Sequence, residues 1–333
     1  MFLAKYSIEE CQDWTEYSDA WNEMMKEFYW YKESPVFDWN RDEELDAIRS
    51  DIGKDGRLFI VAREKKTARI IGLLGATFNG VTSQLRRWEP ATLSEVAGTQ
   101  VAKDLVNGMM RRLKEKGVRV VRVLLKYPHG NPESTSFLRE LFTTTGFRQV
   151  GQPGVDLVLK LHQTIRPVEP KVDYEVRTGE SLTPEEMAEY VIAAYASTLE
   201  DRALFEPDSS VTEYDGALEF VSRVVRGDLG PAPSEFRRAL FVDGEPAAHV
   251  GAFVNESAFK PLTGVLGPVG VLPQFRRKGI GRFLVEQVLE ALRRFGCEYA
   301  AAGTGASNVR AIKFYERMGF RLACDLEWYE RNL

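Results

Sequence analysis

The stretch QFRRKGIGRFLVEQVLEALRRFG, residues 274–296, places three cations and two glycines directly before an amphipathic helical pattern. A helix start already carries unpaired N–H groups and a partial positive charge, so further cations there weaken the helix unless an anion binds. Glycine has no Cβ atom and lets a ligand approach the backbone closely. The stretch therefore predicts a site for a phosphate or pyrophosphate at the start of a helix.

Composition narrows the class of protein. A chain of 333 residues is long for one hydrophobic core and fits two domains. The formal net charge of −5 argues against general nucleic-acid binding, which usually needs a strongly basic surface. Three widely separated cysteines and only three histidines predict neither a metal site nor a disulfide framework. The sequence shows no signal-peptide pattern and no long apolar run, so we expect a cytoplasmic protein that binds no membrane.

The order of the predicted elements repeats along the chain. In the first half, strand patterns over residues 57–63 and 69–78 precede a helix over 93–116, a further strand and a short helix. A proline-containing, charged stretch, TIRPVEPKVD at residues 164–173, then interrupts the pattern as a linker would. After it, strands and helices return in the same order.

One local match supports this repeat. FLRELFTTTGFRQV in the first half aligns with AIKFYERMGFRLA in the second, so that Gly146-Phe147 falls on Gly319-Phe320. A match in corresponding elements indicates the duplication of one α/β unit. We therefore predict a domain over 1–163, a linker over 164–173 and a second domain over 174–333.

A second motif follows the predicted anion site. Arg276-x-x-Gly279-x-Gly281 is followed by Asn308-x-x-Ala311-x-x-x-Tyr315-x-x-x-Gly319-Phe320. Together the two motifs resemble the GNAT superfamily of acyl-CoA N-acyltransferases, and the repeated order resembles tandem-GNAT proteins. The resemblance implies an α/β fold class with two tandem GNAT-like domains, each a mixed but mostly antiparallel sheet flanked by helices. The dinucleotide motif G-x-G-x-x-G fits less well, because Leu284 stands where its third glycine would be.

The resemblance also implies acetyl-CoA as the cofactor, with coenzyme A as the product. In the family, the loop and helix start hold the coenzyme pyrophosphate through backbone N–H groups, and the pantetheine arm bonds to the open edge of the preceding strand. Pro268 favours such a distorted edge because it cannot donate to a sheet ladder. A merely basic helix start and, for Asn308, a plain helix cap are the alternatives. Carried over to this sequence, the coenzyme-binding residues are Val269, Val271, Arg276, Arg277, Lys278, Gly279, Ile280, Gly281, Arg282 and Asn308.

Two catalytic candidates follow from the resemblance. Tyr315 matches the family's usual general acid near the coenzyme sulfur, with a core tyrosine as the alternative. The common base, a glutamate on the fourth strand, has no counterpart, because no carboxylate lies between Glu256 and Glu286. His249 is the leading substitute, since its ordinary pKa lies near neutrality. The alternatives are a water chain as the proton carrier, with His249 merely packed, and the carboxylate of Leu333, which follows the closing strand.

The candidate residues for binding the acceptor lie in a segment without a clear helix or strand pattern. LEDRALFEPDSSVTEYDG, residues 199–216, carries six carboxylates against one arginine. In the family this region walls the acceptor site, so the resemblance implies a small cationic amine that contacts Glu206, Asp208 and Glu213. A solvated acidic loop is the alternative. The partner is then a small-molecule amine acceptor, and the chain acts as a monomer or a homodimer.

The first half departs from the motifs. Phe142 stands opposite Tyr315, and residues 97–102 stand opposite Arg276–Gly281 without the arginine and the glycine pair. We therefore expect the first half to bind no coenzyme A.

Three functions fit this sequence. The favoured one is an acetyl-CoA-dependent N-acetyltransferase that acts on a primary amine of a small, cationic molecule. The second is a mycothiol-synthase-like or peptide-terminal acyltransferase, and the third is a non-catalytic acyl-CoA-binding module. Tyr315 favours the enzymes, because a binding module needs no acid near the sulfur.

Overall fold

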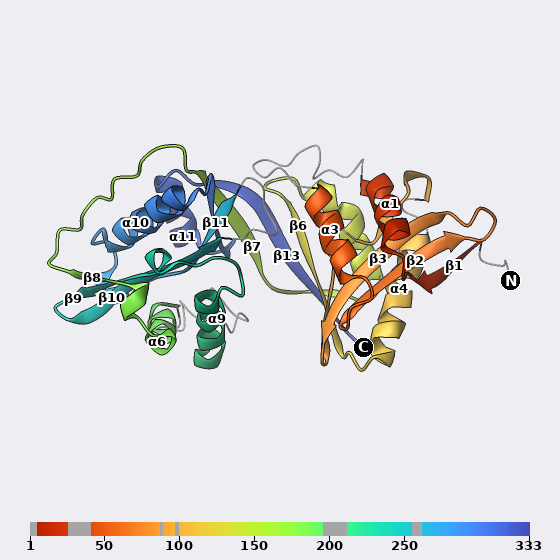
Figure 1. Cartoon of the computed structure of the whole chain (residues 1–333), viewed down its shortest axis with the longest axis horizontal. Coiled ribbons are helices and arrows are strands. Elements are labelled where there is room, and N and C mark those ends of the chain that lie inside the picture. The colour runs from red at the N-terminus through yellow and green to blue at the C-terminus, as the bar shows by residue number, and fades with distance from the viewer. Residues whose placement is uncertain (1–4, 26–40, 87–88, 97–99, 196–211, 255–261) are drawn as a thin grey trace. The chain divides into compact units, whose positions relative to one another are not determined.

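The computed structural model describes residues 5–25, 41–86, 89–96, 100–195, 212–254 and 262–333. The chain forms two compact units, coloured from red to blue along the sequence in Figure 1. Of the described residues, those up to Val150 and those from Cys324 to Leu333 form unit 1, and those from Gly151 to Ala323 form unit 2. Each unit combines a mixed sheet with flanking helices, which confirms the predicted α/β fold class.

Unit 1 is built on an antiparallel meander that ends in a parallel pair. Strands β1 to β4 pair antiparallel in chain order, and β4 then pairs parallel with β6. Its strands are β1 (Tyr6–Glu10), β2 (Arg57–Glu64), β3 (Ile70–Asn79), β4 (Thr82–Leu85), β5 (Ala91–Thr92) and β6 (Val120–Pro128), and its helices are α1 (Trp14–Met25), α3 (Arg41–Asp51), α4 (Gln100–Glu115) and α5 (Ser136–Thr144).

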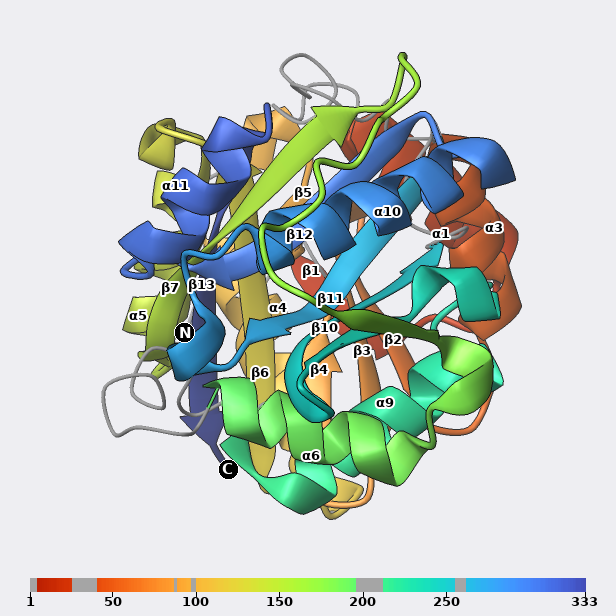
Figure 2. The same ribbon diagram turned by 90° about the vertical axis from the view of Figure 1, so that its left-hand side faces the viewer.

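Unit 2 repeats this arrangement. Strands β8 to β11 pair antiparallel in chain order, and β11 pairs parallel with β12. Helix α10 lies on one face of this sheet, whereas α6 and α9 lie on the other (Figure 1, Figure 2). The strands are β8 (Glu175–Thr178), β9 (Arg238–Val242), β10 (Glu245–Val254), β11 (Thr263–Val271) and β12 (Tyr299–Gly305), and the helices are α6 (Pro184–Tyr195), α9 (Tyr214–Arg226), α10 (Ile280–Phe295) and α11 (Val309–Arg317).

Each unit receives its last strand from the other half of the chain. From Gly151 onward, β7 (Arg148–Lys160) belongs to unit 2, where it pairs antiparallel with β12. From Cys324 onward, β13 (Arg321–Asn332) belongs to unit 1, where it pairs antiparallel with β6. The units are therefore discontinuous in sequence, and the linear division at residues 163 and 174 stays a prediction.

A bulge in β11 shapes the centre of unit 2. A Cβ atom on Gly264 would lie 2.4 Å from Leu292 of α10, and one on Gly270 would lie 2.4 Å from Ala194 of α6. Positions six residues apart share one face of a regular strand, yet these two face helices on opposite sides. The reversal arises because Val250 and Ala252 of β10 pair with Val269 and Leu266, which gives β11 one extra residue.

Candidate functional site

The loop between β11 and α10 presents a row of backbone donors. A short 3₁₀ turn, Pro273–Phe275, leads into Arg277 and Gly279, which have φ angles of 65° and 84°. Left-handed residues next to a helix start turn successive N–H groups toward one side. Within the described part of the chain, the N–H groups from Arg277 to Arg282 have no hydrogen-bond acceptor. This loop, residues 276–282, is called the anion loop below.

The two glycines of the anion loop are required by its geometry. Gly279 holds a left-handed conformation that side-chain-bearing residues rarely adopt. A Cβ atom on Gly281 would lie 2.9 Å from Cγ2 of Val271, so the helix start packs closely on the end of β11. Free donors and a surface kept clear of side chains fit a pyrophosphate group. The residues present therefore fit the coenzyme that the sequence motifs imply.

Some cationic side chains of the anion loop bond to other residues, whereas others are exposed and form no ion pair with a described residue. The Arg276 guanidinium donates from Nε to the Val271 carbonyl at 3.0 Å and from Nη2 to the Ala194 carbonyl at 3.2 Å. Arg282 pairs with Glu286 at 2.7 Å. Arg277 and Lys278 are exposed and form no ion pair with any described residue, so these two side chains are available to an anion.

The edge of β11 opens just before the anion loop. Its pairing with β12 ends at Leu266↔Ala302, whereas β12 continues beside β7 as far as Gly305↔Gly154. Beyond Leu266, the backbone of Val269 bonds to a side chain instead of a strand. The Tyr195 hydroxyl accepts from the Val269 N–H at 2.7 Å and donates to the Val269 carbonyl at 2.5 Å.

Sequence reasoning missed Tyr195. Its position as the last residue of α6 carries no motif, and an aromatic residue at a helix end usually packs in a core. Val269 lies 74 residues further along the chain. Only the tertiary fold brings the two together.

Tyr315 lies on α11 with its ring enclosed by other aromatic rings. Its side chain is 6% exposed, and its ring centre lies 5.2 Å from those of Phe314 and Phe320. Burial, with a smaller contribution from the neighbouring Tyr195, raises the pKa of Tyr315 above its ordinary value of 10. The phenol is therefore protonated at neutral pH, and the raised pKa makes it a weaker acid than a free tyrosine.

Asn308 caps the helix that carries Tyr315. Its Oδ1 accepts from the Ala311 N–H at 3.2 Å, and its Nδ2 donates to the Thr304 hydroxyl at 3.1 Å. The side chain is buried, so both ends of the amide are committed within the fold. The structure shows the capping role, and a coenzyme contact of Asn308 stays a prediction.

His249 lies on β10 opposite Gly270, on the face covered by α6. Burial lowers the pKa of its imidazole to about 4, so the ring is neutral at neutral pH and is a weak base. Neither ring nitrogen has a hydrogen-bond partner within the described residues. His249 borders a cavity of about 20 Å³ together with Arg237 and Pro268, which is room for about one water molecule.

The predicted acceptor residues are only partly described. Glu213 is exposed at the N-cap position of α9, and its side chain makes no capping bond. Glu206 and Asp208 lie outside the described residues. Contacts of these three carboxylates with an acceptor stay a prediction.

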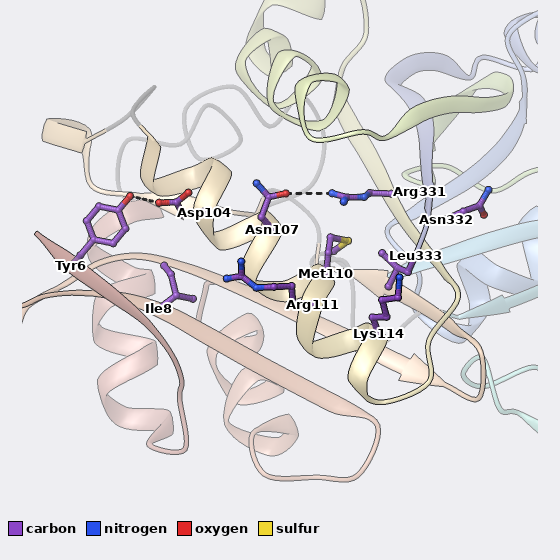
Figure 3. Close-up of a pocket in the computed structure, with 10 residues that line it drawn as sticks. All are labelled: Tyr6, Ile8, Asp104, Asn107, Met110, Arg111, Lys114, Arg331, Asn332 and Leu333. Carbon is purple, nitrogen blue, oxygen red and sulfur yellow. Dashed lines mark hydrogen bonds between the residues drawn. The ribbon is translucent and has the colours of Figure 1, made fainter. Parts of the chain in front are cut away.

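A larger pocket, of about 700 Å³, lies in unit 1 between β1, α4 and the end of β13 (Figure 3). Tyr6 donates to Asp104 at 2.6 Å on one side, while Arg111 and Lys114 line the other. Its walls come from the length of α4 and from strands. The pocket therefore does not repeat the loop-and-helix-start arrangement of unit 2.

The described residues contain neither a candidate metal site nor a candidate membrane-spanning helix. No group of three or more histidine, cysteine, aspartate or glutamate side chains there could hold a metal ion. No helix in that part of the chain is long and apolar enough to cross a bilayer.

Part of the chain is similar in sequence to known proteins. The sequence profile described as "Acetyltransferase (GNAT) family" matches residues 199–320. N-alpha-acetyltransferase 30 of Xenopus laevis is 26% identical over 121 residues, which cover 32% of this chain and 44% of that protein. The uncharacterized N-acetyltransferase YvbK of Bacillus subtilis (strain 168) is 28% identical over 74 residues, covering 22% and 48%. The chain thus spans less than half the length of either relative.

Solved structures match the whole chain in fold. A GCN5-related N-acetyltransferase from Sphaerobacter thermophilus gives a TM-score of 0.66 at 14% identity, covering 100% of this chain and 97% of that one. A tandem GNAT protein from the clavulanic acid biosynthesis pathway gives 0.60 at 14% identity, covering 98% of each chain. The GNAT family profile thus matches residues 199–320, and the whole chain shares the fold of solved GNAT proteins, including a tandem one, as the motifs predict.

Proposed function

We propose that this protein is an acetyl-CoA-dependent N-acetyltransferase whose unit 2 transfers an acetyl group to a primary amine of a small molecule. The free backbone N–H groups of the anion loop are the observation that carries this proposal, because they offer donors without acceptors at a helix start. Acetyl-CoA, when bound, supplies an acetyl group activated as a thioester.

The residues of unit 2 divide the work of binding. The N–H groups from Arg277 to Arg282 hold the pyrophosphate, and the exposed side chains of Arg277 and Lys278 add ionic contacts. The edge of β11 at Val269 and Val271 would bind the pantetheine arm. Arg276 keeps the loop in place by bonding to the Val271 carbonyl.

Tyr315 is the proposed general acid. Oη carries its proton at neutral pH and would donate it to the departing sulfur, although the raised pKa lowers the driving force for this transfer. His249 is the proposed base, although its pKa near 4 gives it a small driving force to take a proton. A His249→Gln variant with full turnover at every pH would assign that step to water instead.

The proposed acceptor is a small, cationic amine attracted by the carboxylates of residues 199–216. Attraction between partly exposed charges is screened over about 8–10 Å at ordinary ionic strength. We expect the acceptor KM to rise with added salt, while acetyl-CoA binding, held largely by backbone donors, changes less. Neutralising Glu206, Asp208 and Glu213 together should raise the acceptor KM without a matching fall in kcat.

The experiment that tests the proposal is a panel of amines with acetyl-CoA, read by the release of free thiol. Acetylation of at least one amine, abolished in a Gly279→Glu variant, is the expected result. Binding of acetyl-CoA by calorimetry without thiol release from any amine would favour the non-catalytic binding module. The low pKa of His249 favours this second function, because it makes the imidazole a weak base.

A further inference from the structure

The Tyr195 hydroxyl makes an unusual contact with a strand edge. One oxygen accepts from the Val269 N–H at 2.7 Å and donates to the carbonyl of the same residue at 2.5 Å. A buried backbone donor and acceptor need partners, and no strand provides them at this position. The phenol therefore acts as a substitute for a neighbouring backbone amide.

The position of Val269 makes this contact significant. The β11 residues that pair with β12 end at Leu266, and Pro268 in between has no N–H group to offer. Val269 is thus the first residue beyond the bulge whose backbone N–H and carbonyl both bond to a residue outside the strands. These groups lie on the edge that the proposed function assigns to the coenzyme, so that function underlies this inference.

The end of α6 is fixed tightly enough to keep the phenol there. Ala194 packs so closely on Gly270 that a Cβ atom on the glycine would lie 2.4 Å away. Arg276 of the anion loop donates to the Ala194 carbonyl at 3.2 Å and to the Val271 carbonyl at 3.0 Å. The end of α6, the edge of β11 and the anion loop are therefore joined by one set of hydrogen bonds.

We propose that the Tyr195 hydroxyl occupies the coenzyme's place on Val269 in the free protein, and that acetyl-CoA binds only by displacing it. Tyr195 is then a positioning residue that keeps the open edge of β11 satisfied and lowers the coenzyme affinity. Binding breaks two hydrogen bonds before it forms its own, so part of the interaction free energy is lost in the exchange. Through the Ala194 carbonyl, the same displacement reaches the anion loop.

The test is acetyl-CoA titration calorimetry on the wild type and on Tyr195→Phe, which keeps the ring and removes the competing oxygen. We expect the variant to bind acetyl-CoA about tenfold more tightly, equivalent to about 1.4 kcal/mol. Tyr190→Phe is the matched control, because Tyr190 lies on the same helix with its ring packed on Phe241. Its affinity should equal that of the wild type.

The outcomes separate the inference from the proposed function. Wild-type binding with equal or weaker binding by Tyr195→Phe would overturn the displacement and leave the coenzyme assignment standing. No acetyl-CoA binding by any of the three proteins would overturn both. A purely structural role of Tyr195 would lower the melting temperature without tightening the affinity. Tyr195→Leu, which also lacks the oxygen, gives the same prediction if the Phe variant does not fold.

Discussion

The two units share one helix-end turn but differ in the group that does chemistry. In unit 1, Phe142 packs on Phe147 with ring centres 5.2 Å apart, and in unit 2 Tyr315 packs on Phe320 at the same 5.2 Å. Each later residue donates its N–H to the carbonyl of the earlier one, at 2.9 and 3.1 Å. The turn is thus a packing device common to both units, and the hydroxyl of Tyr315 is an addition to it.

The glycines of this turn explain why its backbone is the same. Gly146 and Gly319 have φ angles of 87° and 92°, a left-handed conformation that ends a helix at little cost only in glycine. The repeated sequence therefore encodes the turn and its ring pair. The proposed acid catalysis depends on one further atom, the hydroxyl oxygen of Tyr315, which Phe142 lacks.

The largest effect is expected when Tyr315 of unit 2 is replaced by phenylalanine, the residue that unit 1 has at this position. Tyr315→Phe should lower turnover by roughly a hundredfold or more, because it removes the proposed acid. Acetyl-CoA affinity and melting temperature should change little, since the ring pair with Phe320 is kept. Steady-state kinetics and calorimetry on the same preparation measure both. Phe142→Tyr is the reverse control and should add no turnover, whereas full activity in Tyr315→Phe would place the acid elsewhere.

The N-termini of α4 and α10 occupy corresponding positions in the two units. Aligning the ends of α4 and α10 at Gly117 and Gly296 puts Gln100 opposite Gly279. Gly279→Glu should weaken acetyl-CoA binding tenfold or more, about 1.4 kcal/mol, because its side chain strains the left-handed residue and brings negative charge to the anion loop. Gln100→Glu makes the corresponding change in unit 1 and should leave the affinity unaltered. Equal effects of the two changes in calorimetry would contradict the assignment of the site to unit 2.

The exchanged strand of unit 1 depends on one carboxylate. Glu327 on β13 accepts from Arg139 through two bonds of 2.9 Å and from the Tyr127 hydroxyl at 2.8 Å. Burial alone would raise the pKa of Glu327, but these bonds lower it overall. Glu327→Gln should therefore cost about 1–3 kcal/mol of unfolding free energy. Urea titration measures this loss, and an unchanged midpoint would show that β13 is held by its backbone alone.

The smallest effect concerns Glu290, a carboxylate on α10 of unit 2. The hydrogen bond from Arg293 is the main cause that lowers the pKa of Glu290 to about 2, with the Ile165 N–H and Arg294 adding to it. The folded pKa lies below the ordinary 4.5, so the stability from Glu290 is complete above that pH and is lost as the pH falls toward 2. Urea unfolding at neutral pH and between these two values should show a smaller loss on acidification in Glu290→Gln than in the wild type. Parallel losses in both proteins would assign the acid sensitivity to other groups.

Much of the fold and the core of the site follow from short-range patterns in the sequence. The glycines at 279 and 281, the cap at Asn308 and the turn at Gly319 are local features, because each conformation is set by residues a few positions away. The strand exchange is not local. The patterns of β7 and β13 predict strands, but they do not say which sheet each strand joins.

The side-chain roles within the site also depend on the tertiary fold. The resemblance assigns Arg276 to the coenzyme through its backbone and gives its side chain no role, whereas the guanidinium bonds to the carbonyls of Val271 and Ala194. His249 was weighed by its ordinary pKa, but complete burial lowers that pKa to about 4. Both differences arise from neighbours on other elements, which no single-sequence pattern encodes.

The number of acetyl-CoA molecules bound per chain shows whether one unit or both units bind the coenzyme. We propose that the two units of one fold differ in function because residues 97–102 of unit 1, which align with the start of the anion loop, lack its arginine and its glycine pair. Calorimetric titration of the intact chain should give one site, and Gly279→Glu should weaken that site while Gln100→Glu leaves it unchanged. Two equivalent sites, or a single site that weakens with Gln100→Glu and not with Gly279→Glu, would contradict the account.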